Sequence, residues 1–371
     1  MILRILDLQE ACKKILNAVD SDQTTSITDA LEIVSDGNRI SINVTNHEYY
    51  ARVYLPCEAT AVFKATVNAK LFLSLIAQTT TDTVELSIAD TNLKVKANGT
   101  YKLPLIFEGD NLLELPEINL VNETNSFRVD AEILHSILKY NSKELLKGTI
   151  ARPVQKLYYL DEKGAITFTS GACVNEFTLE QPVKVLLNNK IVKLFKLFKE
   201  GPVNFTIGYD AISNDIVQTK VRFATDDVVL TSILSCDDSL LNQFPAEKVR
   251  SRATSVYPYS VAINKDAIIS TINRLLIFSS NKTGLKPRSR FEFGAEELVI
   301  YDANGENKES VHYTKETTPM TDTYSMYLDL NDFKTTLETC TEQYLTINFG
   351  NKEAIVVARG KIYNVVPEAR I

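Results

Sequence analysis

The amino-acid sequence predicts an α+β protein of three repeated domains, each with two helices packed on two small antiparallel sheets. One motif recurs: an apolar residue, then Asp or Asn, then a run with apolar residues at helical spacing. Asp and Asn favour helix starts because their side-chain oxygen accepts a hydrogen bond from a first-turn N–H. Successive copies lie 58 to 76 residues apart, which indicates internal pseudo-symmetry. The copies are Leu6-Asp7, Val67-Asn68, Val129-Asp130, Leu187-Asn188, Ile263-Asn264 and Leu330-Asn331.

The elements follow in the same order along each third of the chain. Helices are expected over 7–20, 68–80, 130–147, 188–199, 264–278 and 331–343. Alternation with period two predicts antiparallel strands within 30–55, 84–105, 156–180, 203–234, 290–301 and 344–358. Hairpin turns are expected at Asp36-Gly37, at Asn98-Gly99 and between Asp161 and Gly164. The stretches 109–126 and 237–259 are irregular, and we expect domains over 1–122, 123–250 and 251–371.

Composition excludes several classes of protein. No apolar run is long enough to span a bilayer, and Met1 leads directly into the first expected helix. We therefore expect no membrane segment, no signal peptide and a cytoplasmic location. The cysteines are odd in number and scattered, which argues against a disulfide framework or a zinc site and favours a reducing compartment. They are Cys12, Cys57, Cys173, Cys236 and Cys340.

The charge is segregated, although modestly. The chain carries a net charge of −7, yet the six expected helices together hold 13 Lys or Arg and 10 Asp or Glu. The rest of the chain is therefore more acidic than the whole. An acidic exterior around a basic helical surface is the hypothesis that this distribution favours.

Segment 188–199 shows the basic surface best. Its apolar residues recur at helical spacing on one face, and lysines occupy the opposite face with no acidic residue in the segment. One such helix alone is also typical of an ordinary solvated face. Repeated over several helices, the pattern suits sequence-independent contact with phosphates. The lysines and arginine expected on this phosphate-facing surface are Lys13, Lys14, Lys139, Lys143, Lys190, Lys193, Lys196 and Arg274, and Lys147 continues the spacing of Lys139 and Lys143.

The sequence offers little catalytic chemistry. Its histidines, His47, His135 and His312, have no Cys or carboxylate at metal-ligand spacing, and His312 is expected in a polar loop. No phosphate-binding loop, dinucleotide fingerprint or nucleophile elbow occurs. We therefore expect a binding scaffold rather than an enzyme, with no metal and no cofactor. An enzyme with an unrecognised site and a β-rich structural protein of a virus particle remain the alternatives, and a neutral helix face would favour the latter.

Over its full length, the chain resembles the bacterial DNA polymerase III beta subunit family, the DNA sliding clamps. A version carried by a phage or mobile element is left open. No single motif is highly specific; the threefold layout and the tail carry the resemblance together. The stretches concerned are Thr66-Val-Asn-Ala-Lys-Leu-Phe-Leu, Tyr101-Lys-Leu-Pro-Leu, Arg152-Pro-Val, Ser239-Leu-Leu-Asn-Gln-Phe-Pro, Arg274-Leu-Leu-Ile-Phe-Ser and the tail Val365-Val-Pro-Glu-Ala-Arg-Ile371.

The resemblance implies the clamp fold and a processivity factor. Two chains would form a head-to-tail homodimer, a six-domain ring with helices around double-stranded DNA and sheets outside. It would bind DNA without sequence preference, tether the polymerase and other DNA-acting proteins, and associate with the nucleoid. A heterologous interface that closes is compatible with internal pseudo-symmetry. Residues expected at the dimer interface are Ile277 and Phe278 of one chain and Tyr101 and Leu103 of the other, with ordinary core positions as the alternative.

The resemblance also implies a pocket for short peptide motifs of the polymerase and the clamp loader. The family's usual Asp-Gly-His/Phe-Arg-Leu run is here Ser170-Gly171-Ala172-Cys173-Val174. Gln155 stands where the family has Leu, and Pro367 replaces the tail's Met, so an altered specificity is expected. The matching positions are Gln155, Thr169, Gly171, Cys173, Val174, Pro245, Lys248, Val249, Val365 and Pro367.

Overall fold

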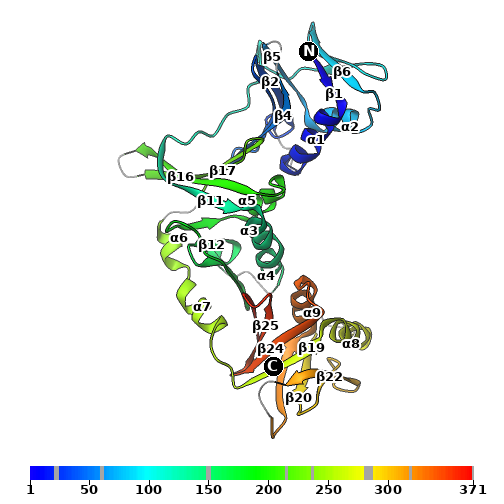
Figure 1. Cartoon of the computed structure of the whole chain (residues 1–371), viewed down its shortest axis with the longest axis vertical. Coiled ribbons are helices and arrows are strands. Elements are labelled where there is room, and N and C mark those ends of the chain that lie inside the picture. The colour runs from blue at the N-terminus through cyan, green and yellow to red at the C-terminus, as the bar shows by residue number, and fades with distance from the viewer. Residues whose placement is uncertain are drawn as a thin grey trace. The chain divides into compact units, whose positions relative to one another are not determined.

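The computed structural model describes residues 1–20, 25–58, 62–147, 152–213, 216–234, 238–279, 287–316 and 320–369. The chain divides into two compact units. Figure 1 labels the helices and strands. Unit 1 comprises residues 1–135 and 190–237, and unit 2 comprises residues 136–189 and 238–371. Each unit is described by itself.

Unit 1 holds the N-terminal helices and three sheets. Its helical elements are α1 (Ile5–Ile15), the 3₁₀ turn η1 (Leu16–Ala18), α2 (Ala69–Ala77), nearly all of α3 (Ala131–Ser136), most of α5 (Asn189–Lys193) and the 3₁₀ turn η4 (Leu194–Leu197). Its strands are β1 (Ile2–Arg4), β2 (Ala30–Asp36), β3 (Arg39–Thr45), β4 (Tyr49–Glu58), β5 (Val62–Asn68), β6 (Thr83–Ala89), β7 (Asn92–Lys96), β8 (Thr100–Pro104), β9 (Phe107–Glu108), β10 (Asn111–Leu112), β11 (Asn122–Asp130), β16 (Pro202–Ser213), β17 (Ile216–Ala224) and β18 (Val228–Ile233).

The strands of unit 1 form a four-stranded sheet, β1-β6-β7-β8, an eight-stranded sheet, β11-β16-β17-β18-β4-β3-β2-β5, and the small hairpin β9-β10. The eight-stranded sheet is continuous because β18 pairs with β4 in antiparallel register, from Val228 opposite Val53 to Ser232 opposite Tyr49. Strands far apart in the sequence therefore share one hydrogen-bonded ladder.

Unit 2 holds the C-terminal elements and the middle of the chain. Its helical elements are the π turn η2 (Ile137–Asn141), α4 (Ser142–Glu144), the 3₁₀ turn η3 (Pro153–Lys156), α6 (Asp238–Gln243), α7 (Ala246–Ala253), α8 (Lys265–Phe278) and α9 (Leu330–Thr339). Its strands are β12 (Tyr158–Asp161), β13 (Gly164–Phe168), β14 (Ala172–Glu176), β15 (Lys184–Leu187), β19 (Tyr259–Asn264), β20 (Arg288–Phe293), β21 (Glu297–Tyr301), β22 (Lys308–Glu316), β23 (Tyr324–Asp329), β24 (Tyr344–Gly350), β25 (Glu353–Ala358) and β26 (Ile362–Pro367).

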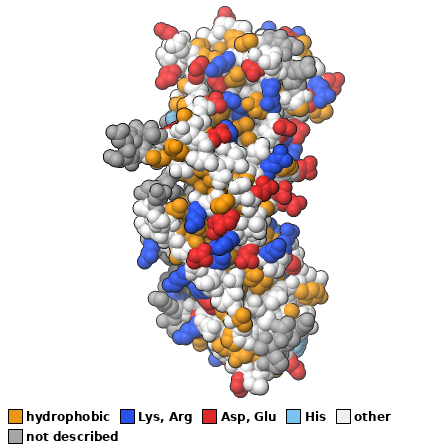
Figure 2. All heavy atoms as spheres, turned by 60° about the vertical axis from the view of Figure 1, so that its left-hand side comes forward, with side chains coloured by type: hydrophobic (Ala, Val, Ile, Leu, Met, Phe, Trp, Pro, Cys, Tyr) orange, Lys and Arg blue, Asp and Glu red, His pale blue; other side chains and the backbone are white. Residues whose placement is uncertain are grey.

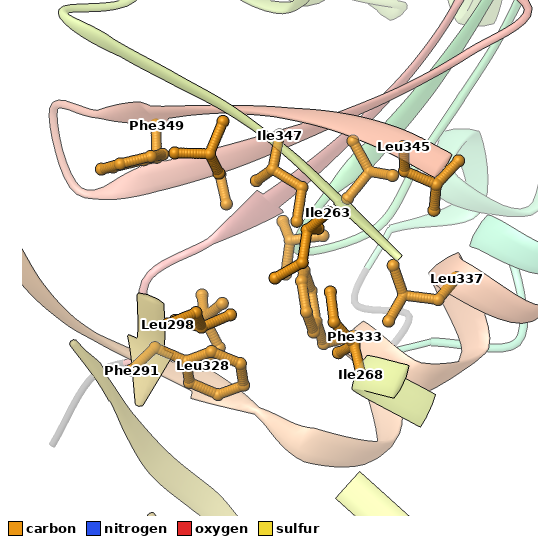
Figure 3. Close-up of a cluster of buried hydrophobic side chains, with 14 of the residues drawn as sticks. Ile263, Ile268, Phe291, Leu298, Leu328, Phe333, Leu337, Leu345, Ile347 and Phe349 are labelled. Atoms are coloured by element: carbon orange, nitrogen blue, oxygen red, sulfur yellow. The ribbon is translucent and has the colours of Figure 1, made fainter. Parts of the chain in front are cut away.

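A single twelve-stranded ladder runs through unit 2, in the order β15-β12-β13-β14-β26-β25-β24-β19-β22-β21-β20-β23. Here β14 pairs with β26, from Ala172 opposite Val365 to Asn175 opposite Ile362. Helices α8 and α9 pack on the strands through a large apolar core (Figure 3). Ile268 of α8 and Phe333 and Leu337 of α9 are fully buried in it.

The same order of elements occurs three times in the described residues: strand, helix, four strands, helix, three strands. The repeats begin at β1, β11 and β19. In each, the first strand lies in one ladder with the last three, and the remaining four strands pair with one another. In the third repeat β22 also pairs with β19, which joins the two ladders. The repeat that the sequence predicts is therefore present, and the α+β fold class is confirmed. The boundaries of the three expected domains stay a prediction.

The expected helix starts are right in part. Asn68 and Asn264 cap α2 and α8, because their side chains accept from the N–H of Leu71 and of Ala267. Asp7 and Asn331 are not caps. Helix α1 already begins at Ile5, and Asp7 pairs with Arg4 instead. Helix α9 begins at Leu330, where Asp329 accepts the N–H of Asn331 and of Asp332.

Other expectations fail in identifiable places. Stretch 237–259, expected to be irregular, contains α6 and α7, and the expected link 109–126 contains β10 and the start of β11. His312 lies in β22 rather than in a loop. Helix 130–147 is interrupted by a π turn that ends at Asn141, whose buried amide donates to the carbonyls of Ala165 and Cys173 at 3.2 Å each. The sheets are larger than expected because they join across the repeats.

Candidate functional site

Lysines project from the surface of α5 and η4 in unit 1. On the inner side Ile191 and Phe195 are fully buried, and Phe195 packs edge-on against Phe223 of β17 at 5.1 Å between ring centroids. This packing fixes the rotation of the helix, so that Lys190, Lys193 and Lys196 are exposed. The amphipathic pattern of segment 188–199 is therefore present, although only its first turn is α-helical.

Helix α1 lies beside η1 and η4 and adds Lys13 and Lys14. Lys13 is exposed. Lys14 is largely covered, with its side chain 15% exposed, and its Nζ lies 2.6 Å from a carboxylate oxygen of Asp227. Lys190 pairs similarly with Glu48 at 2.9 Å. Exposed ion pairs contribute only about 0–1 kcal/mol, so a phosphate can compete with Glu48 for Lys190.

In unit 2 the expected cations behave differently from one another. Lys139 and Lys143 are exposed, and Lys139 lies 4.9 Å from the ring centroid of Tyr140. Arg274 of α8 is exposed but forms an ion pair with Glu309, with Nε 2.9 Å from the carboxylate. Lys147, which continued the spacing of Lys139 and Lys143, is buried. Its assignment to the basic surface is wrong.

Two exposed cations of unit 1 were missed as candidates. Arg128, in β11, and Lys199, which follows η4, line a hollow of about 570 Å³ together with Lys14. A weak sequence signal exists for Lys199, which continues the spacing of Lys193 and Lys196. No such signal exists for Arg128, because only the pairing of β11 with β16 brings that strand to the hollow. On the face drawn in Figure 2, basic and acidic side chains are interspersed rather than gathered into fields of one sign.

A cavity of about 1120 Å³ opens in unit 2. Five of the ten expected pocket residues line it: Gln155, Thr169, Gly171, Val365 and Pro367. Cys173 and Val174 are buried within β14, where they support the wall without reaching the cavity. Pro245, Lys248 and Val249 lie at the start of α7 and are not among the lining residues, although Lys248 is exposed.

The floor of this cavity is a buried polar network. Glu144 accepts hydrogen bonds from Lys147 Nζ at 3.0 Å and from Thr169 Oγ1 at 2.6 Å. Lys147 also donates to Thr336 Oγ1 of α9 at 2.6 Å. Gly171 lies against this network. A Cβ there would stand 2.3 Å from the carbonyl oxygen of Val365, so only glycine permits this close approach of β14 and β26.

The cavity walls carry charges that the sequence did not bring together. Arg252, Arg288 and Lys352 line it, as do Asp329, Asp332 and Glu368. Arg252 pairs with Glu353, whereas within the described residues no carboxylate lies within ion-pair distance of Arg288 or Lys352. Arg252, Arg288 and Lys352 come from α7, β20 and the β24–β25 turn, respectively, and only folding makes them neighbours. The walls therefore offer a ligand charged groups as well as apolar ones such as Val365 and Pro367.

The four residues expected at the dimer interface are mostly accessible. Tyr101 is 38% exposed, Ile277 74% and Phe278 52%, whereas Leu103 is half-buried. An ordinary core position, the alternative for these residues, is therefore excluded for Tyr101, Ile277 and Phe278. Exposed large apolar side chains of this kind are typical of interaction surfaces when they gather.

The cysteines with described side chains, Cys12, Cys173 and Cys340, are free and buried. Burial raises the pKa of the Cys12 thiol to about 12, which leaves it unreactive at neutral pH. Cys57 and Cys236 lie outside the side chains that the structure describes. Within the described residues, no group of three or more His, Cys, Asp or Glu side chains could hold a metal ion. No helix among them is long and apolar enough to cross a membrane.

Comparison with known proteins gives one kind of match. No family model matches the sequence, and no curated protein sequence is similar to it. Solved structures do match. The sliding clamp of Bacillus subtilis has a TM-score of 0.79 at 14% identity, over 100% of this chain and 98% of that one. The DNA polymerase III subunit beta of Pseudomonas aeruginosa, a sliding clamp solved with griselimycin bound, has 0.81 at 15%, over 100% and 99%.

A third structure, the beta sliding clamp of C. crescentus, has a TM-score of 0.77 at 14% identity and covers 100% of this chain and 98% of that one. It carries polyethylene glycol at its proposed beta-motif tethering region. Identities this low establish the fold alone. The chain therefore has the sliding clamp fold that the sequence predicts.

Proposed function

We propose that this chain belongs to the DNA sliding clamp family and acts as a processivity factor that encircles double-stranded DNA. The observation that carries the proposal is the match of its whole length to the whole length of bacterial sliding clamps. The basic helical surfaces support it. Lys13, Lys193 and Lys196 in unit 1 and Lys139 and Lys143 in unit 2 are exposed, as sequence-independent contact with phosphates requires.

The repeated topology supports a head-to-tail homodimer. Within the chain, the fourth strand of a repeat pairs with the last strand of the next repeat. This occurs at two places, where β4 pairs with β18 and where β14 pairs with β26. By the same rule, β22 of the third repeat would pair with β8 of the first repeat in a second copy. This contact would involve residues 308–312 of β22, which pair with β21, because the end of β22 from Tyr313 to Glu316 already pairs with β19. Strand β8 is an edge of its sheet, and Tyr101 and Leu103 lie on it. Two copies would then close a ring with no such edge left over.

The cavity of unit 2 is the proposed site for short peptide motifs of a polymerase and a clamp loader. Gln155, Thr169, Gly171, Val365 and Pro367 line it, and Cys173 and Val174 support its wall. Pro245, Lys248 and Val249 would bind the same motif only where it extends beyond the cavity. We place the protein in the cytoplasm, associated with the nucleoid, and assign it no catalytic role.

The test combines the mass of the protein in solution with its retention on circular and linear DNA. Light scattering should give twice the 41.6 kDa of one chain. In the presence of a clamp loader, the protein should remain on nicked circular DNA and leave the same DNA after it is cut. A monomer that is retained equally on circular and linear DNA, or on neither, would overturn the proposal. Such a result would favour a structural protein or an enzyme instead.

A further inference from the structure

Four charged side chains of unit 1 form a continuous ion-pair chain along the hollow beside α1. Lys199 Nζ lies 2.6 Å from Glu10, Glu10 lies 3.6 Å from Lys14 Nζ, and Lys14 Nζ lies 2.6 Å from Asp227. Asp227 also accepts the hydroxyl of Thr225 at 2.7 Å. The two carboxylates thus hold two of the cations that line the hollow, while Arg128 has no carboxylate within ion-pair distance in the described residues.

We infer that Glu10 and Asp227 compete with DNA phosphates for Lys14 and Lys199 and thereby keep the contact of this surface with DNA weak. The inference rests on the proposed function. The side chains of Glu10, Asp227 and Lys199 are at least half exposed, and that of Lys14 is 15% exposed. Each ion pair therefore has at least one solvent-exposed member, where a phosphate can replace the carboxylate. Each phosphate that binds one of these lysines must break an existing ion pair, which makes the free energy of DNA binding less favourable.

The position of the ion-pair chain fits this role. Glu10 and Lys14 lie one turn apart on α1, and Lys199 follows η4, the element that carries Lys196. Asp227 is fixed by the β17–β18 turn, since its carbonyl accepts the N–H of Tyr54 at 2.8 Å. The hydrogen bond from Lys199 lowers the pKa of Glu10 and so favours the ionised form of this carboxylate. A clamp that must slide benefits from such competition, because tight phosphate contacts would slow its movement along DNA.

The test measures how DNA binding depends on salt. Binding of the full chain to a short double-stranded oligonucleotide is followed by fluorescence anisotropy over a series of NaCl concentrations. Each lysine newly bound to a phosphate steepens the plot of log K against log[salt] by about 0.9. Glu10→Gln, which frees Lys199, should steepen it by about 0.9. Glu10→Gln with Asp227→Asn should steepen it by about 1.8 and tighten binding about two- to fivefold per freed lysine.

Glu200→Gln is the matched control. Glu200 lines the same hollow and is exposed, but it forms no ion pair with a described residue. Its removal takes away the same charge without freeing a lysine, so the salt slope should stay unchanged. In a Lys14→Gln/Lys199→Gln background, the two carboxylate substitutions should have no effect on the slope.

Three outcomes would overturn the inference. If Glu10→Gln/Asp227→Asn binds the oligonucleotide with the affinity and the salt slope of the wild type, the two lysines gain no phosphate contact. An equal gain in Glu200→Gln would show a general charge effect. If the wild-type protein neither binds the oligonucleotide at low salt nor remains on circular DNA, the proposed function itself fails, and the inference fails with it.

Discussion

Lys147 and Glu144 form a buried ion pair, with Nζ 3.0 Å from the carboxylate and side chains 6% and 0% exposed. The pair joins α4 to α9 through Thr336 and holds Thr169 at the floor of the cavity of unit 2. Loss of either partner would leave an uncompensated charge buried away from water, which strongly destabilises the folded state. The pair is therefore structural, and it also shapes the proposed peptide site.

Lys147→Met should destabilise unit 2 by about 3–5 kcal/mol, because it leaves the Glu144 carboxylate buried with Thr169 as its one remaining partner among the described residues. The urea midpoint of unfolding measures this loss. Glu144→Gln combined with Lys147→Met should lose less than Lys147→Met alone, since no charge then stays buried. Lys143→Met, an exposed neighbour, should change stability by no more than about 0.5 kcal/mol. Equal losses for Lys143→Met and Lys147→Met would contradict the assignment.

Lys147 also shows where sequence reasoning ends. Helical periodicity located every repeat helix, because apolar residues must face a core whatever the details of the turn. It placed Lys139, Lys143 and Lys147 on one face by assuming an unbroken α-helix. The π turn over Ile137–Asn141 widens the helix, and α4 ends at Glu144, so Lys147 leaves that face. The interruption coincides with contacts of Asn141 to β13 and β14, which a local pattern does not contain.

The pairing of the strands and the set of residues that line the cavity are harder to predict from the sequence. The alternation within β4 or β18 predicts two strands but not their pairing, because any edge strand offers the same backbone groups. Only the folded sheet brings Gln155, Gly171 and Pro367 together with Arg288 and Lys352. Gln155, Gly171 and Pro367 were expected through the resemblance to a family. Arg288 and Lys352 were not, since nothing in their sequence surroundings marks a site.

Replacing Lys193 and Lys196 with Gln should weaken DNA binding and flatten its salt dependence. Both lysines are exposed on η4 and α5, opposite the buried Phe195. If each contacts one phosphate, the slope of log K against log[salt] should fall by about 1.8 in magnitude. Lys361→Gln, at the exposed β25–β26 turn, is the control and should leave the slope unchanged. A double variant that binds with the wild-type slope would exclude this face from DNA contact.

Ile277→Ser with Phe278→Ser should convert the expected dimer to a monomer. Both side chains are largely exposed at the end of α8, so their loss should leave the fold intact and the melting temperature nearly unchanged. Light scattering reports the mass, which should fall to 41.6 kDa. Val256→Ser, 96% exposed in the link between α7 and β19, should leave the mass as it is. A variant that keeps the wild-type mass would move the interface elsewhere.

Asp7 should make the stability of unit 1 depend on pH. Arg4 donates to its two oxygens at 2.8 and 2.7 Å, and these hydrogen bonds lower the pKa of Asp7 from 3.8 in the folded state. A lowered folded pKa contributes stability above the unfolded value, and this stability is lost as the pH falls through the folded value. Asp7→Asn should therefore melt below wild type at neutral pH and approach it in acid. Arg4→Gln should behave alike; a constant difference at every pH would refute the pairing.

Two asparagines that look equivalent in the sequence should differ in their effect on stability. Asn264 accepts the N–H of Ala267 at 3.0 Å, whereas Asn331 is exposed inside α9, whose first turn is capped by Asp329 at 2.9 Å. Removing a true cap costs about 1 kcal/mol, so Asn264→Ala should lower the urea midpoint of unit 2. Asn331→Ala leaves the cap in place and removes a poor helix former, so it should be neutral or slightly stabilising. Equal losses for the two variants would mean that Asn331 starts the helix in solution, as its sequence motif alone predicts.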